Sequence, residues 1–252
     1  MDLIRINRAL AAAGVCSRRK ADDLVRAGLV AVNGAPVLKP GLGVDPLKDK
    51  VSVRGRDIDL SSVSGEGSRI CLMLHKPAQV VSTVSDPQGR PTVMDGLPGN
   101  LGEKRLYPVG RLDYFSEGLI LLTDDGALTN RLTHPRGHLP RLYRVVLRET
   151  PDAAALDRMR RGMTLSEGET LLPARVKSLS PNILEITVRQ GVNRQIRRMC
   201  RDLGLTILSL CRTGFGPLRL GDLPRGACRP LSEEEMEDLR AAAGLPRAPG
   251  AG

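Results

Sequence analysis

The chain has 252 residues, and its 38 lysine and arginine residues against 28 aspartate and glutamate residues give a formal net charge of +10. The length allows one or two domains. So basic a balance favours a polyanionic partner, with nucleic acid ahead of an anionic membrane surface. We expect no membrane association, because the chain has no Trp, only two Phe and no apolar run of about 18 residues.

The five cysteines lie far apart and include no C-x-x-C pair, so their spacing indicates neither a zinc site nor a redox couple. We expect reduced thiols, a cytoplasmic location and no bound metal. The apolar start of the chain contains Arg5 and Arg8, and we interpret it as a helix of the folded protein and not as a signal peptide.

The first 60 residues predict a small domain of two short helices and a small sheet. An apolar pattern at helical spacing covers Leu3–Ala13. Ser17 is a suitable N-cap for a second helix over residues 18–27, which Gly28 ends. Asn33-Gly34 lies between two apolar-alternating pieces and predicts a hairpin, because both residues tolerate positive φ.

A stretch rich in serine and glycine, residues 61–68, predicts a linker between a domain of residues 1–60 and a larger one of residues 69–243. Residues 244–252 predict a disordered tail. In the larger domain, strands and helices do not alternate regularly, which indicates an α+β fold with a mainly antiparallel sheet. The expected strands are residues 70–77, 80–86, 119–125, 142–149, 174–180 and 183–190, and the expected helices are residues 127–132, 151–161, 194–203 and 232–243.

The segment Gly110–Gly126 carries the strongest candidate for chemistry. A polar loop with Arg111, Asp113 and Glu117 runs directly into an apolar strand, which places Asp113 at the lip of a cleft beside the core. Such a carboxylate can act as nucleophile or base. Taken alone, an aspartate in a loop is more often a turn former or a helix cap.

Basic side chains gather in two further segments. Residues 189–201 contain five arginines and no acidic residue, and a helix from Arg194 would place four of them on neighbouring turns, where they can meet phosphates or one buried carboxylate. The alternative is a solvated basic face. The cluster Arg18-Arg19-Lys20 opens the second helix and can bind phosphates together with the positive helix end. The predicted RNA contacts are Arg18, Arg19, Lys20, Arg194, Arg198 and Arg201.

Four motifs in this order resemble those of the ribosomal pseudouridine synthases of the RsuA/RluB type. They are HKP at His75–Pro77, GRLD at Gly110–Asp113 with the following GLILLTDDG, RLYRV at Arg141–Val145 and NRQIRRM at Asn193–Met199. The similarity runs over about residues 69–239. Residues 3–60 resemble the S4 RNA-binding domain that commonly precedes this catalytic domain. The resemblance implies an S4-like α/β domain followed by a pseudouridine synthase domain.

The resemblance also implies residue roles. Asp113 matches the family's single essential aspartate, Tyr143 the tyrosine that packs against the target base, and Arg197 the arginine that pairs with the aspartate. Ile196 matches the aliphatic residue of the pocket, and Arg111 an arginine associated with the flipped-out nucleotide. Three positions depart from the usual pattern, which puts local loop shape and target choice in doubt: Gln79 for Gly, Ser116 for Thr and Arg141 for Lys.

The implied reaction breaks the N1–C1′ bond of a uridine, turns the base and joins C5 to C1′. It involves no redox change and no external group, so no cofactor is expected. The target must leave its stack at a cost of about a few kcal/mol. We expect ribosomal RNA or a ribosomal subunit precursor as the partner of a monomeric enzyme. NRQIRRM favours large-subunit (23S) RNA, with small-subunit (16S) RNA as the alternative.

Two other functions remain open at this point. An S4-like module with a charge of +10 would suffice for a non-catalytic RNA-binding protein of ribosome assembly. A metal-dependent nuclease could use Asp124 and Asp125 with His134 or His138, although adjacent carboxylates diverge and more ligands would be needed. We interpret Asp124-Asp125 instead as part of a turn that begins the next helix.

Overall fold

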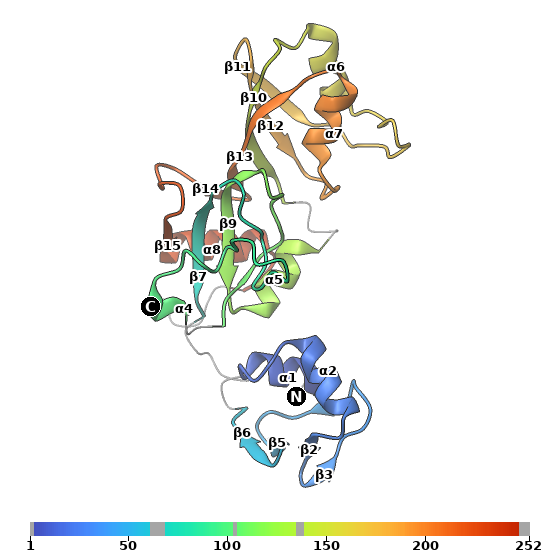
Figure 1. Cartoon of the computed structure of the whole chain (residues 1–252), viewed down its shortest axis with the longest axis vertical. Coiled ribbons are helices and arrows are strands. Elements are labelled where there is room, and N and C mark those ends of the chain that lie inside the picture. The colour runs from blue at the N-terminus through green and yellow to red at the C-terminus, as the bar shows by residue number, and fades with distance from the viewer. Residues whose placement is uncertain (1–2, 61–68, 103–104, 135–138, 247–252) are drawn as a thin grey trace. The chain divides into compact units, whose positions relative to one another are not determined.

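The computed structural model describes residues 3–60, 69–102, 105–134 and 139–246 and separates the chain into two compact units, Met1–Arg69 and Ile70–Gly252 (Figure 1). The predicted linker, residues 61–68, lies outside the described residues. Each unit has its own hydrophobic core.

The N-terminal unit packs two helices on a small antiparallel sheet, and its core includes Ile6, Leu10 and Leu24. The hydroxyl of Ser17 accepts a hydrogen bond from the Lys20 amide at 3.1 Å, which confirms the predicted N-cap. The hairpin at Asn33-Gly34 is confirmed, with φ angles of 51° and 81°. The elements are β1 (Ile4–Arg5), α1 (Ile6–Ala12), α2 (Arg18–Arg26), β2 (Val30–Val32), β3 (Ala35–Pro36), β4 (Gly43–Val44), β5 (Val51–Val53) and β6 (Arg56–Ile58).

The first predicted helix was placed too early. It begins at Ile6, and Leu3, which the helical pattern included, is 66% exposed. The preceding residues Ile4–Arg5 instead pair with Gly43–Val44 as β1 and β4. Pairing with a segment 38 to 40 residues away in the chain therefore overrides the local helical spacing.

The C-terminal unit is built on one large sheet in the order β11-β12-β10-β13-β9-β7-β15. Neighbouring strands are antiparallel except where β13 runs parallel to β9, so the predicted α+β class with a mainly antiparallel sheet is confirmed. The strands are β7 (Cys71–Lys76), β8 (Tyr107–Pro108), β9 (Glu117–Thr123), β10 (Arg141–Leu147), β11 (Arg175–Ser180), β12 (Ile183–Val188), β13 (Ile207–Phe215), β14 (Leu218–Arg219) and β15 (Cys228–Pro230).

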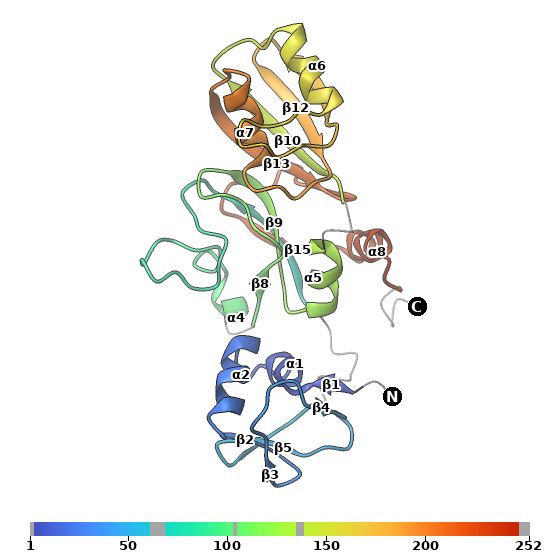
Figure 2. The same cartoon turned by 90° about the vertical axis from the view of Figure 1, so that its right-hand side faces the viewer.

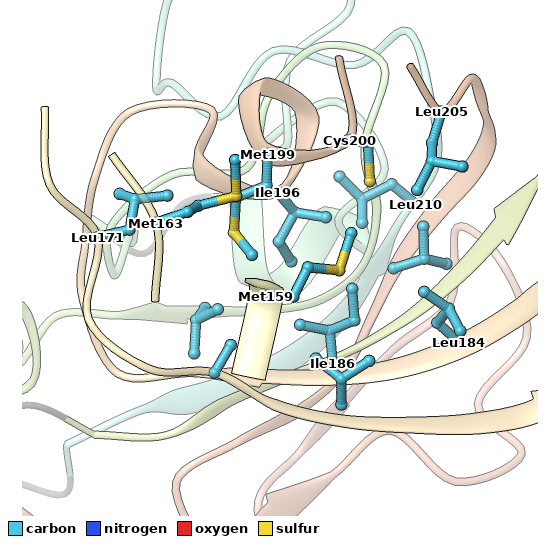
Figure 3. Close-up of a cluster of buried hydrophobic side chains, with 14 of the residues drawn as sticks. Met159, Met163, Leu171, Leu184, Ile186, Ile196, Met199, Cys200, Leu205 and Leu210 are labelled. Carbon is cyan, nitrogen blue, oxygen red and sulfur yellow. The ribbon is translucent and has the colours of Figure 1, made fainter. Parts of the chain in front are cut away.

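The helices of this unit cover the sheet at both ends. Figure 1 shows α6 and α7 beside β10–β13, and Figure 3 shows the core between them, where Met159 of α6 and Ile196 and Met199 of α7 meet Ile186 and Leu210 of the strands. The helices are α4 (Gly99–Gly102), α5 (Gly126–Thr133), α6 (Ala153–Arg161), α7 (Gln195–Asp202) and α8 (Glu233–Ala242).

The other end of the sheet is covered on both faces, as the alternation of a strand requires. Leu119 and Leu121 of β9 pack in the cluster of α5 and α8. Ile120 and Leu122, which point the opposite way, pack with Leu112 and other residues of the segment between β7 and β9. Figure 2 shows part of this segment, with α4, on one side of β9 and α5 and α8 on the other. This second layer carries the loop that enters β9.

Two strand predictions need correction. Residues 80–86 form no strand: Val81 makes one isolated bridge to Thr92, Ser82 is buried, and Val84 is 53% exposed, the reverse of an apolar-in pattern. Strand β13, at the centre of the sheet, was not predicted. Polar and apolar residues do not alternate regularly along this strand, and the charged Arg212 is one of its buried residues, at 4% exposure.

The predicted disordered tail also begins too early. The amide of Leu245 donates to the Arg240 carbonyl at 2.9 Å, and Arg240 Nε donates to the Pro246 carbonyl at 2.8 Å. Leu245 packs against the cluster that contains Leu239. Residues 244–246 are therefore part of the fold, and residues 247–252 lie outside the described residues.

Candidate active site

A cavity of about 340 Å³ lies in the C-terminal unit, between segments that are far apart in the sequence. Its walls come from the loop before β9, from β10 and β13, and from the loop and first turn that lead into α7. Five residues that the sequence analysis marked for the active site all line it: Arg111, Asp113, Tyr143, Ile196 and Arg197.

Asp113 lies in the short loop between β8 and β9, and backbone contacts hold this loop. The Leu112 amide donates to Ser82 Oγ at 3.1 Å, and the Gln79 amide donates to the Tyr114 carbonyl at 2.6 Å. Gly118 then carries the chain past β13 at φ +108°, where a Cβ would lie 2.3 Å from the Arg212 carbonyl oxygen. Only glycine allows so close an approach, so the loop is fixed at the parallel junction of the sheet.

Arg197 of α7 joins this loop from the other side of the cavity. Its Nε lies 3.7 Å from Asp113 Oδ2, an ion-pair distance that is too long for a hydrogen bond. Its Nη2 donates to the Phe115 carbonyl at 2.9 Å and to Ser116 Oγ at 3.1 Å. Burial lowers the pKa of Arg197 from its ordinary value, and the charge of Asp113 opposes that shift. The guanidinium thus anchors the loop while it stands beside the carboxylate.

The hydroxyl of Ser116, one of the departures from the family pattern, takes part in this contact. Its oxygen is the acceptor for Arg197, and the residue is 2% exposed. Serine supplies the same acceptor as the usual threonine. The loop therefore keeps its link to α7.

Tyr143 and Ile196 supply the apolar part of the cavity. Tyr143 lies on β10 opposite Ile186 of β12 and Arg212 of β13, and it is half-buried. Ile196 is 4% exposed and belongs to the core under α7. Arg111 is exposed beside the buried Leu112, so it lines the cavity from a solvent-accessible position.

The helix expected from Arg194 begins one residue later, at Gln195. Arg194 precedes it in the left-handed conformation, with φ 50° and ψ 31°. It lines the cavity with Arg197 and also lines a second, more open cavity of about 770 Å³ that includes Arg198 and Arg201.

Arg198 and Arg201 are not the uncompensated charges that the sequence indicated. Arg198 donates to Glu169 at 2.6 Å and to Glu167 at 3.2 Å. Arg201 pairs with Glu167 at 2.6 Å and with Asp202 at 2.8 Å. Glu167 and Glu169 lie 29 to 34 positions earlier in the chain than the arginines they pair with, so a window of local sequence does not include them.

Two buried cations near the cavity, Arg212 and Lys76, were not predicted as site residues from the sequence. Arg212 lines the cavity at 4% exposure, and its Nε donates to the Leu119 carbonyl at 2.7 Å. Lys76 is fully buried, and its Nζ donates to the Pro77 carbonyl at 2.8 Å. Burial lowers the pKa of Lys76 to about 8, although the charges of Glu117 and Asp113 act to raise it. No local signal marks Arg212, because β13 itself was not predicted.

The three predicted basic residues of the N-terminal unit, Arg18, Arg19 and Lys20, form the first turn of α2 and are exposed. Their position at the start of a helix agrees with the expectation.

The predicted metal alternative finds no support in the described part of the chain. No group of three or more histidine, cysteine, aspartate or glutamate side chains gathers there as metal ligands. Asp125 caps α5 through the Ala127 and Leu128 amides, both at 2.9 Å, and Asp124 accepts a bond from the Ile70 amide. His138 lies outside the described residues.

Among the described helices, none has the length and hydropathy to cross a membrane.

Comparison with known proteins gives matches over both units. A family model described as RNA pseudouridylate synthase matches residues 70–202, and a model of the S4 domain matches residues 4–50. The ribosomal large subunit pseudouridine synthase B of Bacillus subtilis (strain 168) is 36% identical over 245 residues, 95% of this chain and 96% of that protein. An uncharacterized RNA pseudouridine synthase of Aquifex aeolicus (strain VF5) is 37% identical over 251 residues, 98% of this chain and 97% of that protein.

A solved structure agrees with these sequence matches. The crystal structure of a pseudouridylate synthase has a TM-score of 0.67 and 27% identity, and the match covers 94% of this chain and 99% of that one. Fold, cavity and matches define the class of the protein as an RNA-modifying isomerase. The chain belongs to the RNA pseudouridylate synthase family and carries an S4 domain in its N-terminal unit. The family resemblance seen in the sequence is confirmed, and a purely non-catalytic RNA-binding function is not favoured.

Proposed function

We propose that this enzyme converts a specific uridine of ribosomal RNA to pseudouridine, and that the uridine lies in the large-subunit (23S) RNA. One observation carries the proposal: the loop with Asp113, strand β10 with Tyr143 and helix α7 with Arg197 line a single cavity. The name of the Bacillus subtilis relative and the NRQIRRM motif support large-subunit RNA as the substrate. Small-subunit (16S) RNA is the alternative.

The cavity suits one flipped nucleotide, since its volume of about 340 Å³ is in the usual range for small-molecule sites. We assign Asp113 as the catalytic carboxylate, acting either as nucleophile on the sugar or as base toward a sugar proton. In both cases the carboxylate must be ionised. Arg197 places a positive charge 3.7 Å from this carboxylate and fixes the loop through Phe115 and Ser116.

The uracil must be held while it turns, and the remaining cavity residues can do this. Tyr143 offers an aromatic face for stacking, worth about 1–3 kcal/mol per base. Ile196 closes the cavity with an apolar surface that forms no hydrogen bond and so does not fix one orientation of the base. Arg111, at the exposed side of the cavity, is placed to contact the displaced strand or its phosphates.

The remaining basic residues are proposed as contacts to the RNA backbone. Arg18, Arg19 and Lys20 present three exposed charges at the positive end of α2. Arg194 is exposed beside the cavity. Arg198 and Arg201 can reach phosphates only if they exchange glutamate oxygens for phosphate oxygens. We propose a monomer that acts in the cytoplasm without a cofactor on ribosomal RNA or on a subunit precursor.

The proposal is tested by mapping pseudouridines in ribosomal RNA from a strain that lacks this protein. One large-subunit pseudouridine should disappear and return with the wild-type gene, but not with Asp113→Asn, whose amide has the same shape and neither attacks nor accepts a proton. The purified variant should keep its fold and RNA affinity. Loss of a small-subunit pseudouridine would select the alternative target, and turnover by Asp113→Asn would remove Asp113 from the chemistry.

A chelator provides a second test. Activity that survives exhaustive treatment with EDTA excludes the metal-dependent alternative. Loss of activity that added metal restores would contradict the assignment of Asp113 as a metal-independent catalyst.

A further inference from the structure

Two arginines in the wall of the cavity, Arg141 and Arg212, have no anionic partner among the described residues. Arg212 is 4% exposed, and the guanidinium carbon lies 5.4 Å from the centre of the Phe215 ring. The guanidinium carbon of Arg141 lies 5.9 Å from the same ring centre. Nη1 of Arg141 is buried and makes no hydrogen bond within the described structure.

The sheet register places these arginines beside the proposed stacking residue. Arg212 of β13 lies directly opposite Tyr143 of β10, and Arg141 precedes Tyr143 by two positions. Residues two apart on a strand point to the same face, and all three side chains line the cavity. Gly191 covers Arg141 from the loop before α7, since a Cβ there would lie 3.7 Å from Nη1.

The acidic groups nearby are already engaged. Asp113 pairs with Arg197, and Glu117 pairs with Arg225 at 2.8 Å. Among the residues that the structure describes, no carboxylate forms an ion pair with Arg141 or Arg212. Burial lowers the pKa of Arg141, and the neighbouring Arg212 lowers it further, while Tyr143 has the opposite effect. Two desolvated like charges cost stability unless an anion completes the site.

We propose that Arg141 and Arg212 form an oxyanion-binding site that holds a negatively charged oxygen of the flipped nucleotide. This inference rests on the proposed function. The oxygen has two possible sources with the same chemistry. One is a phosphate oxygen of the target nucleotide. The other is a carbonyl oxygen of the uracil.

The uracil acquires a charge during the reaction itself. When the N1–C1′ bond breaks, its electron pair stays with the base, and the negative charge spreads over N1, O2 and O4. The charge is lost when C5 forms the new bond to C1′, the C5 proton leaves and N1 takes up a proton. A fixed guanidinium that donates to O2 or O4 stabilises this stage more than the ground state, and that difference increases the rate.

The test uses the full-length protein and an RNA fragment that contains the mapped uridine. Arg141→Met removes the charge and keeps much of the volume, and Arg141→Lys keeps the charge but not the planar fork. Arg144→Met is the matched control, because Arg144 is exposed on the same strand and points to the opposite face. The measurements are the unfolding midpoint, the RNA dissociation constant and the single-turnover rate at saturating enzyme.

We expect Arg141→Met to lose about 10- to 100-fold in affinity or in single-turnover rate, with partial rescue by Lys and no loss from Arg144→Met. The unfolding midpoint of Arg141→Met should stay unchanged or rise, because a desolvated cation is removed. A purely structural arginine would give the reverse, with a lower midpoint and a rate that recovers at lower temperature. That outcome, or wild-type affinity and rate, would overturn the proposal.

A neutral methylphosphonate in place of each phosphate flanking the target distinguishes the two sources. If the site holds phosphate, Arg141→Met weakens RNA binding, and one methylphosphonate causes no further loss in that variant. If it holds the uracil, affinity is kept, the single-turnover rate falls, and methylphosphonate effects add to those of the variant. Both outcomes support an oxyanion site. Failure of the proposed function is seen separately, as a wild-type protein that forms no pseudouridine.

Discussion

Arg197 and Arg198 are neighbours on α7, but their surroundings are opposite. Arg198 has two glutamate partners, the nearer at 2.6 Å. Arg197 faces the cavity, where its one carboxylate partner stands 3.7 Å away and its Nε makes no hydrogen bond. The comparison shows that the position of an arginine on a helix does not by itself indicate whether its side chain faces a cavity or pairs with acidic residues. Arg198 can contact RNA only by exchanging a glutamate oxygen, whereas Arg197 already faces the cavity and its Nε makes no hydrogen bond within the described structure.

The largest effect is expected at Arg197. Replacement by Met leaves Asp113 without its cation and frees the loop at Phe115 and Ser116, so the single-turnover rate should fall about 100-fold or more. Arg197→Lys keeps a point charge but loses the fork, and an intermediate rate is expected. The measurement is the single-turnover rate against pH at saturating enzyme. Recovery of the Met variant simply by raising enzyme concentration would mean that Arg197 is only a phosphate contact.

A smaller effect, on RNA binding, is expected from replacing Arg201, which pairs with Glu167. Arg201→Met should weaken RNA binding modestly and reduce the salt slope by about 1, with little change in single-turnover rate. Glu167→Gln is the complementary variant, because it weakens the partner of both Arg198 and Arg201. It should strengthen RNA binding and steepen the salt dependence. If neither variant changes the salt slope, these ion pairs stay closed in the complex and the two arginines are structural.

The buried Lys76 near the cavity should make the free energy of unfolding depend on pH. The pKa of Lys76 is about 8 in the fold and 10.5 as its reference value, so between these values the unfolded chain binds more protons. The free energy of unfolding should therefore rise with pH across that window. Urea unfolding of wild type and Lys76→Met from about pH 7 to about pH 10 tests this. A difference between the two proteins that stays constant over the window would show that Lys76 titrates normally.

The smallest effect concerns Gln79, whose backbone supports the loop of Asp113 through the Tyr114 carbonyl. Gln79 has φ 63°, in the left-handed region, which is unfavourable for residues that have a Cβ atom. Gln79→Gly should stabilise the protein by at most about 1 kcal/mol, because relief of strain exceeds the added freedom of the unfolded chain only slightly. Gln79→Val should destabilise it. Thermal unfolding measures both, and the single-turnover rate of the glycine variant should match wild type.

The sequence predicts the elements and the site where local signals decide them. Ser17, Asn33-Gly34 and Asp125 act through their own backbone neighbourhood, and each was found where it was expected. The motif positions Asp113, Tyr143 and Arg197 also meet in one cavity as the resemblance implied. The first three features depend on a few adjacent residues, whereas the meeting of Asp113, Tyr143 and Arg197 was expected only from the family resemblance.

The features that escaped prediction depend on distant partners. Strand β13 is held by β10 and β9, and burial of Arg212 within it interrupts the apolar alternation that would identify a strand. The acidic partners of Arg198 come from a separate loop. Residues 80–86 have the composition of a strand, but no neighbouring strand pairs along their length. Val81 alone among them forms a bridge, to Thr92.

The pairing of β15 with β7 affects how the protein can be made. Cys228 of β15 pairs with Leu74 of β7, the first strand of the catalytic unit. During translation, one edge of β7 stays unpaired until Cys228–Pro230 has been synthesised. An unpaired strand edge is a site for aggregation. The N-terminal unit, whose pairings lie within Ile4–Ile58, can fold long before that point. Synthesis therefore yields a folded RNA-binding unit attached to a nascent catalytic unit that completes its sheet at the end, by pairings of long sequence separation that form slowly.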